Sequence, residues 1–560
     1  MRVPSSSSVL YRSRFLSTGS EVIPTVRCAI VGSGPAGFYT AKYLLEKNSN
    51  ITVDMIERLP TPYGLVRQGV APDHQEVKSV MATFIEVAEN SRFRFFGNIT
   101  LRGNDEDSGK VEHTNELTIS ELQKAYDVIV LAYGASSDRS LNIPGEELNG
   151  CISARSFVNW YNGHPYYTKI GELFDLKKIK RVVVIGQGNV AIDCARILMK
   201  SVDELEKTDI SVSALDALRK SSVEEVVIVG RRGHIQASFT IKEIRELTKL
   251  DNVTVKILQS ELDLSLTEAS ERELAKNRSK HRIIELIKKI AQDSTVGKTE
   301  VNSEKNIDFR FLLSPLEIRK ASKEEKKDGI VGEGIIENNV GSIVFEKNIL
   351  VGEENNQKAV PTGEKEIMNC ELILKSVGYQ SENISGIPFD FKKYVVPNKN
   401  GRVLNTLESK VGSNESKDST SAHSAGHDND RNNDKNGGDN SNYMKGLYVT
   451  GWLKRGPSGI VGTNINDAKE TVDCILQDLS TEIESSDIVV GSDNYGKIDP
   501  IETLPVLTAR TVITWKDYLR IEKEEEKRGQ EVFPPKPREK ICDIDELLSV
   551  AKNENQTLHT

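Results

Sequence analysis

The chain has 560 residues, of which 37% are hydrophobic, and its formal net charge is −9 at neutral pH. This length allows up to about four domains, and the apolar content is sufficient for large cores. The negative charge excludes a general nucleic-acid-binding protein, which would carry a basic domain or stripe, and no apolar run approaches the roughly 20 residues of a membrane-spanning helix.

The N-terminal residues have the composition of a targeting segment. Residues 1–20 contain three arginines and seven serines, and the first acidic residue is Glu21. This pattern is typical of a mitochondrial transit peptide, and the apolar pieces are too short for a secretory signal. We expect residues 1–25 to be a transit or disordered segment and the protein to lie in the mitochondrial matrix, with association at the inner membrane left open.

The first predicted unit is a strand, a glycine turn, a helix and a second strand. Residues 26–31 read as a buried strand, 38–47 as a helix and 51–57 as the next strand. In the turn between them, Gly32 allows the tight bend, Gly34 allows the backbone to approach a pyrophosphate, and Gly37 allows the helix to pack on the strand. This pattern predicts dinucleotide binding at the helix N-terminus.

The residue at the end of the second strand indicates which dinucleotide binds there. Glu57 follows the turn by twenty residues, where a carboxylate accepts hydrogen bonds from ribose hydroxyls. A carboxylate disfavours a 2′-phosphate, so the first site is predicted to hold FAD or NAD.

A second copy of this unit begins at residue 181. Residues 181–185 read as a strand, the turn Gly186-Gln187-Gly188-Asn189-Val190-Ala191 follows, and 190–200 read as a helix. The next strand, 226–229, ends in Arg231 and Arg232 instead of a carboxylate, and guanidinium groups there suit a 2′-phosphate. Two different dinucleotides are implied, unless both arginines are ordinary surface residues.

Two short segments, 126–134 and 372–378, each read as a strand followed by a glycine. Segments of this kind occur where the chain crosses between the domains of flavoproteins with two dinucleotides. We therefore expect an α/β fold with two Rossmann-like dinucleotide-binding domains, the second inserted into the first. The predicted divisions are 26–142 and 374–560 for a discontinuous FAD-binding domain and 143–373 for the NADP-binding domain.

Residues 405–445 are almost devoid of apolar side chains. Such a segment cannot bury enough surface to offset its ordering entropy, so we predict a disordered insert. Its His423 and His427 are expected to be solvated and not to bind a metal.

The sequence closely resembles the mitochondrial NADPH:adrenodoxin (ferredoxin) oxidoreductase family. The specific segments include PTPYGLVRQGVAPDHQEVK, VGRRGHIQASFTIKEIREL and GLYVTGWLKRGPSGIVGTNINDAKETV. The resemblance implies a flavoprotein that takes a hydride from NADPH and passes single electrons to a mitochondrial [2Fe–2S] ferredoxin. The family supports iron–sulfur cluster assembly, haem modification or steroid and P450 chemistry.

The resemblance also implies cofactor-binding residues. Those matching the FAD-binding positions of the family are Ala36, Glu57, Leu65, Leu101, Trp452, Gly459, Ile460 and Val461. Those matching the NADPH-binding positions are Gln187, Gly188, Asn189, Val190, Arg231, Arg232, Glu243 and Gly459. Because residues 456–462 precede a helix-like stretch, 466–476, their N–H groups are expected to face the flavin pyrimidine edge.

Two further matches concern the chemistry itself. His74 and Asp193 correspond to a histidine and an aspartate that lie near the flavin and nicotinamide in related enzymes. They are candidates for a catalytic pair that passes a proton to the reduced flavin, and a structural pair is the alternative. Hydride transfer depends more on orientation than on acid–base help, because the cofactors carry the chemistry.

Lys242, Arg245 and Lys249 share one face of a predicted helix, 239–250. On an acidic chain, such a face could steer an acidic ferredoxin, and the family docks its partner partly through arginines in this region. A solvated face without a partner is the alternative.

The six cysteines are widely scattered, with no pair at the spacing of zinc, iron–sulfur or redox-dithiol sites. We therefore expect no resident metal and no thioredoxin-reductase-like dithiol. An FAD/NADPH monooxygenase and a non-catalytic, NADP(H)-sensing flavin-binding scaffold remain as alternatives.

Overall fold

The computed structural model describes residues 25–103, 115–295, 305–321, 338–406, 442–485 and 498–553. Residues 1–24 of the predicted transit segment and nearly all of the predicted insert, with both of its histidines, lie outside these ranges. Among the described residues, no helix is long and apolar enough to cross a membrane.

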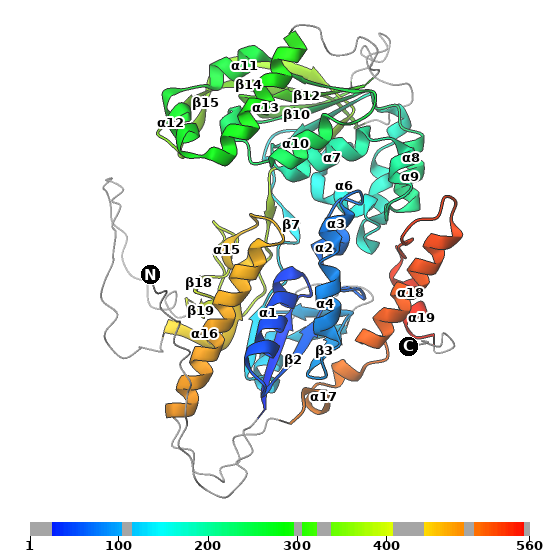
Figure 1. Cartoon of the computed structure of the whole chain (residues 1–560), viewed down its shortest axis with the longest axis vertical. Helices are drawn as coiled ribbons and strands as arrows, with labels where there is room; N and C mark the ends of the chain where they lie inside the picture. The colour runs from blue at the N-terminus through cyan, green and yellow to red at the C-terminus, as the bar shows by residue number, and fades with distance from the viewer. Residues whose placement is uncertain are drawn as a thin grey trace, which may run out of the picture.

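The first unit is built on a seven-stranded sheet with the order β18-β19-β20-β6-β1-β2-β3. Its strands are β1 (Val26–Val31), β2 (Ile51–Ile56), β3 (Phe93–Phe96), β6 (Val128–Leu131), β18 (Asn398–Lys399), β19 (Arg402–Leu404) and β20 (Tyr443–Val449). The run from β20 to β3 is parallel, and the two short outer strands are antiparallel. The helices α1 (Pro35–Lys47) and α16 (Thr463–Ser485) lie side by side on one face (Figure 1).

The second unit is built on a six-stranded parallel sheet with the order β11-β12-β10-β9-β16-β8. Its strands are β8 (Cys151–Ser153), β9 (Arg181–Ile185), β10 (Glu225–Val229), β11 (Val253–Ile257), β12 (Lys305–Arg310) and β16 (Leu372–Lys375). The helices around it include α6 (Ala154–Tyr161), α7 (Asn189–Met199), α10 (Ile241–Leu247), α11 (Gln259–Ser265), α12 (Glu268–Lys276) and α13 (Arg278–Thr295). A small antiparallel sheet is attached, made of β13 (Leu313–Lys320), β14 (Val340–Val351) and β15 (Lys358–Asn369).

The chain passes between the two units along a short antiparallel ribbon. Its strands are β7 (Ser137–Asp138) and β17 (Tyr379–Gln380). Figure 1 shows β7 in the middle of the molecule, with the first unit below and the second above. The ribbon places the outgoing and the returning segments next to each other.

The C-terminal residues run along the side of the first unit. The helices α18 (Trp515–Glu531) and α19 (Ile544–Ala551) join its core, and Trp515 packs edge-on against Tyr63 and Phe95 at 6.4 and 6.3 Å. In Figure 1 the upper part of this segment reaches the level of α8 (Val202–Leu205) and α9 (Val212–Arg219) of the second unit.

Several predicted boundaries differ from the structure. The first helix begins at Pro35, because proline suits the first helical turn after Gly34 at the N-cap. The helix predicted over 239–250 ends at Leu247, so Lys249 lies beyond it. The predicted insert extended to 445, but β20 already begins at Tyr443, where the chain pairs with Leu404 of β19.

Candidate active site

Of the three glycines in the first turn, only Gly34 has open space where a Cβ would lie. Gly32 has a φ of +106°, and a Cβ there would lie 2.6 Å from the carbonyl oxygen of Ala132. A Cβ at Gly37 would overlap the carbonyl oxygen of Gly32. A Cβ at Gly34 would meet no atom of the described chain within 4 Å. The turn therefore packs tightly on the protein side and is open at Gly34, as a pyrophosphate cradle at the N-terminus of α1 must be.

Glu57 is held rigidly at the end of β2. Its carboxylate accepts hydrogen bonds from the Ser33 backbone N–H at 2.9 Å, the Ser33 hydroxyl at 2.7 Å and the Leu59 backbone N–H at 3.0 Å. These three bonds leave acceptor capacity on a carboxylate, which has about four lone-pair sites. The sequence alone did not reveal that Ser33 orients this group.

Two more segments come to the same turn. Gly64, with a φ of +48°, approaches so closely that its Cβ would lie 3.1 Å from the Gly34 Cα, and Leu65 begins α2 (Leu65–Gln68) directly after it. Gly451, with a φ of +67°, would place a Cβ 2.5 Å from that of Ala36. Leu65 and Ala36 are therefore at the turn, as the resemblance implied.

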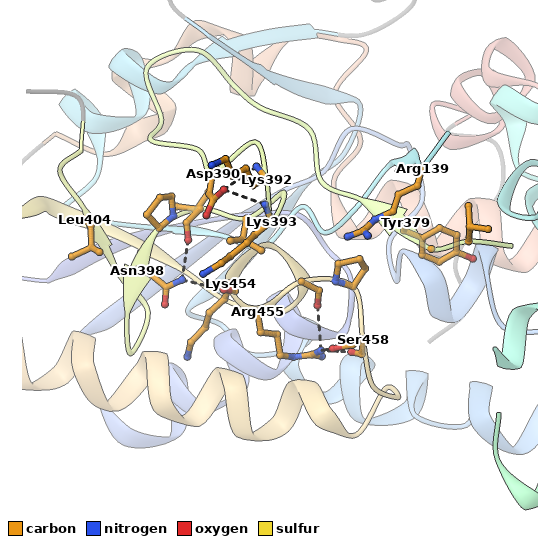
Figure 2. Close-up of a pocket in the computed structure, with 17 residues that line it drawn as sticks. Arg139, Tyr379, Asp390, Lys392, Lys393, Asn398, Leu404, Lys454, Arg455 and Ser458 are labelled. Atoms are coloured by element: carbon orange, nitrogen blue, oxygen red, sulfur yellow. Dashed lines mark hydrogen bonds between the residues drawn. The ribbon is translucent and has the colours of Figure 1, made fainter. Parts of the chain in front are cut away.

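The close contact between Gly451 and Ala36 also brings the 456–462 segment, which follows shortly after in the chain, near α1. The helix α15 (Trp452–Arg455) follows it, and the Trp452 indole donates a hydrogen bond to the Ser458 carbonyl at 3.1 Å. The Arg455 guanidinium binds the same carbonyl (Figure 2). It also binds the carboxylate of Asp467 in α16. These contacts hold the segment in a defined shape next to α1.

The remaining residues predicted to bind FAD are exposed or half-buried. Gly459 is exposed, Ile460 is 65% exposed and Val461 is half-buried. Leu101 lies apart from them on β4 (Ile99–Arg102), half-buried against the core that contains Val31 and Leu131.

The second glycine turn is built differently from the first. Gly186 has a φ of +128°, and a Cβ there would overlap the carbonyl oxygen of Ser376. The Gln187 side chain donates to the Arg310 carbonyl at 3.0 Å, and the Asn189 side chain accepts from the Thr240 N–H at 2.9 Å. Both side chains are thus engaged within the protein. A ligand at this turn would meet backbone N–H groups, mainly near Gly188.

Gly188 and its neighbours border the open part of this second turn. A Cβ at Gly188 would lie 3.5 Å from the Ser238 hydroxyl, which is ordinary contact. Val190 is half-buried against the core of the second unit. Arg231 and Arg232 follow β10 directly and are both exposed, and neither guanidinium pairs with a carboxylate in the described parts of the chain. Both guanidinium groups are free to bind an anion.

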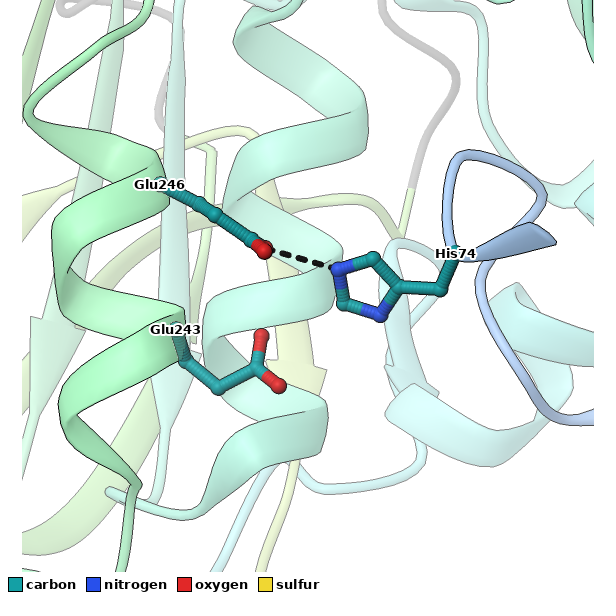
Figure 3. Close-up of side chains that lie close together, drawn as sticks. All are labelled: His74, Glu243 and Glu246. Carbon is teal, nitrogen blue, oxygen red and sulfur yellow. Dashed lines mark hydrogen bonds and ion pairs between the residues drawn. The ribbon is translucent and has the colours of Figure 1, made fainter. Parts of the chain in front are cut away.

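His74 and Asp193 lie in one cluster but are not partners of each other. His74 Nε2 lies 2.7 Å from the Glu246 carboxylate (Figure 3), whereas Asp193 pairs with Arg196 at 2.7 Å. Arg196 also binds Glu243 at 3.0 Å. The direct His–Asp pair considered from the sequence is therefore replaced by a network centred on a guanidinium that is 1% exposed.

Burial controls the ionisation of this network. Burial raises the pKa of the Asp193 carboxyl, although the charge of Arg196 opposes this. Burial, followed by the charge of Asp193, also raises the pKa of Glu243. Burial alone would raise the pKa of Asp73, but its hydrogen bonds to Arg196 lower it to about 2. The cluster thus contains carboxyls that hold protons more readily than exposed ones do.

Three of these side chains have the spacing of metal ligands. The ligand atoms of His74, Glu243 and Glu246 lie within 4.8 Å of one another. However, the Arg196 guanidinium lies 3.0 Å from Glu243 and 3.4 Å from Glu246, so a fixed cation already occupies the space next to both carboxylates. The cluster is a better fit to an ionic network than to a metal ion.

A cavity of about 890 Å³ opens beside the crossover ribbon (Figure 2). The residues that line it include Arg139, Tyr379, Lys392, Lys393, Lys454 and Arg455. The rings of Tyr379 and Trp452 are 5.5 Å apart, which links the ribbon to the flavin candidates. The sequence did not indicate Tyr379, and its only signal was its place directly after Gly378 in the second crossover segment.

Two mainly parallel sheets, each with a glycine turn at a helix N-terminus and joined by a short ribbon, define the class of oxidoreductases with two dinucleotide sites. A family model described as "Pyridine nucleotide-disulphide oxidoreductase" matches residues 26–313. The chain is 39% identical over 543 residues to "NADPH:adrenodoxin oxidoreductase, mitochondrial" of Arabidopsis thaliana, covering 97% of this chain and 98% of that protein. It is 37% identical to "NADPH-ferredoxin reductase FprA" of Mycobacterium leprae, covering 93% and 97%.

A solved structure described as "Mycobacterium tuberculosis FprA in complex with NADPH" is similar with a TM-score of 0.75 and 36% identity, covering 94% of this chain and 99% of that one. The chain belongs to the family of NADPH:adrenodoxin oxidoreductases and NADPH-ferredoxin reductases. These matches confirm the predicted fold class, the family and the assignment to the oxidoreductases. The eukaryotic relatives from Arabidopsis thaliana, Bos taurus and Homo sapiens are named mitochondrial, in agreement with the predicted mitochondrial location.

Proposed function

We propose that the protein takes a hydride from NADPH onto FAD and delivers electrons one at a time to a mitochondrial [2Fe–2S] ferredoxin. The observation that carries this proposal is the contrast between the two sites. The first has an open glycine cradle with the fixed carboxylate of Glu57, and the second has two free arginines after β10. FAD supplies the chemistry when bound, because it accepts electrons as a pair and releases them singly.

FAD fits the first unit, for which we propose residues 26–142 and 376–560. The predicted boundary at 374 moves to 376, because β16 ends at Lys375 and belongs to the second sheet. The N–H groups at Gly34 and Gly37 would bind the pyrophosphate, and Glu57 would accept hydrogen bonds from the adenosine ribose. Gly32 shapes the turn, because its own N–H donates to the Ile56 carbonyl at 2.8 Å. Ala36, Leu65, Leu101 and Trp452 would enclose the cofactor. The backbone of Gly459, Ile460 and Val461 would donate to the flavin pyrimidine edge.

NADPH fits the second unit, for which we propose residues 143–375, so that all of β16 is included. Gly188 and Val190 would bind its pyrophosphate through backbone N–H groups. Gln187 and Asn189 use their side chains within the protein, and the Gly186 N–H donates to the Val229 carbonyl at 2.8 Å. Arg231 and Arg232 would bind the 2′-phosphate with guanidinium forks. Glu243 and Gly459 would lie at the nicotinamide end.

His74 and Asp193 are proposed to act at the meeting point of the two cofactors. His74 is 7% exposed and is oriented by Glu246, so its ring has a fixed direction. Asp193 has a raised pKa and can hold a proton at its carboxyl near neutral pH more readily than an exposed aspartate. These residues would orient the nicotinamide and keep a proton available, while the sheets hold the reacting atoms in place.

The ferredoxin is proposed to dock on the face that carries Arg245 and Lys249. Both residues are exposed, and neither pairs with a carboxylate among the described residues. Lys242 belongs to the same proposed surface, but its ammonium binds Glu76 and lies 3.7 Å from Glu246. Its charge is therefore largely compensated, and the other two should contribute more to steering.

Charge reversal tests this surface. Arg245→Glu with Lys249→Glu should slow association with the ferredoxin by about tenfold or more at low salt, because steering contributes roughly 10- to 1000-fold to such rates. The effect should shrink as ionic strength rises, and NADPH oxidation by ferricyanide should be unchanged. Lys220→Glu, at an exposed lysine after α9, is the matched control. Equal association rates for the two variants at low salt would refute this docking face.

The proposed reaction is tested with purified protein. Anaerobic NADPH should bleach the flavin absorbance, and cytochrome c reduction should require both NADPH and added ferredoxin, with NADH much less effective. A protein that binds no flavin, or one whose flavin NADPH does not bleach, would contradict the proposal.

Within the mitochondrion, we propose that the protein acts in the matrix. Peripheral association with the inner membrane is the alternative. Fractionation of mitochondria with a matrix marker and a carbonate wash separates these two locations.

A further inference from the structure

The C-terminal segment connects the two units at a point remote in sequence from both glycine turns. On the side of the first unit, Glu525 of α18 pairs with Arg67 of α2 at 2.5 Å, and both side chains are at most 4% exposed. On the side of the second unit, Lys536 donates to the Ile210 carbonyl at 2.7 Å. Glu539 accepts from the Val212 backbone N–H at 3.2 Å. One segment thus contacts both dinucleotide-binding units.

A buried cluster of three charges lies at the centre of this junction. Asp209, in the loop between α8 and α9, accepts from Lys78 of α3 (Gln75–Lys78) at 2.6 and 2.8 Å. Lys540 Nζ lies 3.0 Å from Oδ2 of the same carboxylate, an oxygen that also accepts from Lys78. The three side chains are 3%, 6% and 1% exposed for Lys78, Asp209 and Lys540.

Each member of the cluster comes from a different part of the molecule. Lys78 belongs to the N-terminal part of the first unit, Asp209 to the second unit, and Lys540 to the C-terminal segment of the first unit. Charges buried this deeply are stable only when they are paired, and removing one partner is strongly destabilising for the local arrangement. The contact between the units at this place therefore depends on the Asp209 carboxylate.

The pKa shifts within the cluster also indicate that the Asp209 carboxylate is charged and holds the two lysines. Burial alone would raise the pKa of Asp209, but the charges of Lys540 and Lys78 hold it well below its usual range. Burial lowers the pKa of the Lys540 ammonium to about 7, although Asp209 favours the charged form. A carboxylate held between two ammonium groups is a strong and specific point of attachment.

We propose that Asp209 is a positioning residue for hydride transfer, acting through Lys78 and Lys540 to hold the two dinucleotide-binding units at their working separation. The proposal rests on the proposed function, since it presumes that a nicotinamide bound by the second unit must reach a flavin bound by the first. None of the three side chains belongs to the proposed cofactor sites. They should therefore affect the distance between the two cofactors and not the affinity for either one.

The physical basis is the sensitivity of hydride transfer to distance. A misplacement of the reacting groups by 1 Å can lower a rate by about 100-fold. Each glycine turn belongs to one unit alone, so a loosened junction leaves both turns intact while it broadens the distribution of distances between them. The affinity for each cofactor and the rate of transfer should therefore respond differently.

The test is Asp209→Asn in the full-length holoprotein, studied by anaerobic stopped-flow mixing with NADPH. The rate constant of flavin bleaching should fall by about tenfold or more. The FAD content should equal that of the wild type, and the NADPH dissociation constant should stay within about threefold. Asp209→Glu, which keeps the carboxylate, should recover most of the rate. Hydrogen exchange should increase in residues 205–215 and 532–543.

Glu366→Gln is the matched control for the loss of an ion pair. Glu366 binds Arg310 at 2.7 and 3.0 Å, and both residues lie within the second unit. This variant should keep the wild-type bleaching rate. If Asp209→Asn does not fold, Lys540→Met keeps the Lys78–Asp209 pair and should show a smaller fall in rate with unchanged cofactor binding.

The outcomes separate the inference from the proposed function. A wild-type protein whose flavin NADPH does not bleach would contradict the proposed function itself. Bleaching at the wild-type rate in Asp209→Asn, with increased exchange in both segments, would overturn the positioning role alone. A fall in rate that is matched by loss of FAD or of NADPH affinity would also overturn it, since that pattern indicates general damage.

Discussion

Because the space at Gly34 is open, adding one methyl group there should weaken FAD binding with little change in the stability of the apoprotein. Gly34 has φ −74° and ψ −179°, which alanine adopts freely, and a Cβ there meets no atom of the described chain within 4 Å. In the protein without FAD, Gly34→Ala weakens the helix N-cap by up to about 1 kcal/mol but restricts the unfolded chain by a similar amount. The unfolding free energy of the apoprotein should therefore change by less than about 1 kcal/mol.

FAD binding should respond much more strongly to the same change. The methyl group would fill the space that the pyrophosphate needs and lengthen one or two charge-assisted hydrogen bonds, each of which contributes about 1.5–3 kcal/mol. We expect the FAD dissociation constant to rise by roughly 30- to 1000-fold. Flavin fluorescence titration measures the affinity, and urea unfolding of the apoprotein measures the stability.

Gly37 provides the contrasting control, because a Cβ there would overlap the carbonyl oxygen of Gly32. Gly37→Ala must move α1 against its strand, so it should destabilise the apoprotein by about 1–3 kcal/mol as well as weaken FAD binding. Wild-type FAD affinity in Gly34→Ala would refute the placement of the pyrophosphate at this turn.

Two further predictions concern the second unit and the C-terminal junction. Removing both guanidinium groups with Arg231→Ala and Arg232→Ala should cost about 2–3 kcal/mol in NADPH affinity, roughly 30- to 150-fold, and leave NADH binding unchanged. Equal losses for both nucleotides in the titration would contradict 2′-phosphate recognition. The pKa of Lys540 falls from 10.5 to about 7 on folding, so the unfolded chain binds more protons between these values. Stability should therefore rise with pH across this window, by at most about 5 kcal/mol, as Lys540 loses its charge. Lys540→Met should flatten this dependence in urea unfolding at pH 6.5 and 9.5, and an unchanged slope would exclude Lys540 as its source.

The elements that the sequence predicted well depend on local signals. The strands β1 and β9 have the expected bounds, 26–31 and 181–185, because runs of β-branched residues before a glycine turn form buried parallel strands in almost any context. The glycine turns were equally visible, since the need for a positive φ or for close backbone approach is a property of a few adjacent residues.

The features that were missed depend on contacts between distant residues. His74 and Glu246 are 172 positions apart, and Lys536 and the Ile210 carbonyl are 326 positions apart. Nothing in the sequence near His74 favoured Glu246 over Asp193 as its partner. Likewise, the resemblance implied Gln187 and Asn189 as NADPH-binding positions, but the partners of their side chains, Arg310 and Thr240, become neighbours only when the sheet forms.

Residues 73–78 lie within one of the sequence segments that carry the family resemblance, and they also join the two units. Within residues 73–78, Asp73 pairs with Arg196, His74 with Glu246, Glu76 with Lys242 and Lys78 with Asp209. Every one of these partners lies in the second unit, so this short stretch of the first unit forms a continuous ionic contact across the junction.

A hydride can pass only when donor and acceptor atoms are held within about 3–3.5 Å of each other. The same segment therefore serves two needs in the proposed mechanism, because His74 belongs to the proposed catalytic pair while the charges around it hold the two units together. A substitution at Asp73 or Lys78 should then resemble a catalytic defect in its kinetics, even though neither side chain needs to touch a reacting atom. Distinguishing such a defect from a true loss of chemistry requires the transfer rate and both cofactor affinities to be measured in the same variant.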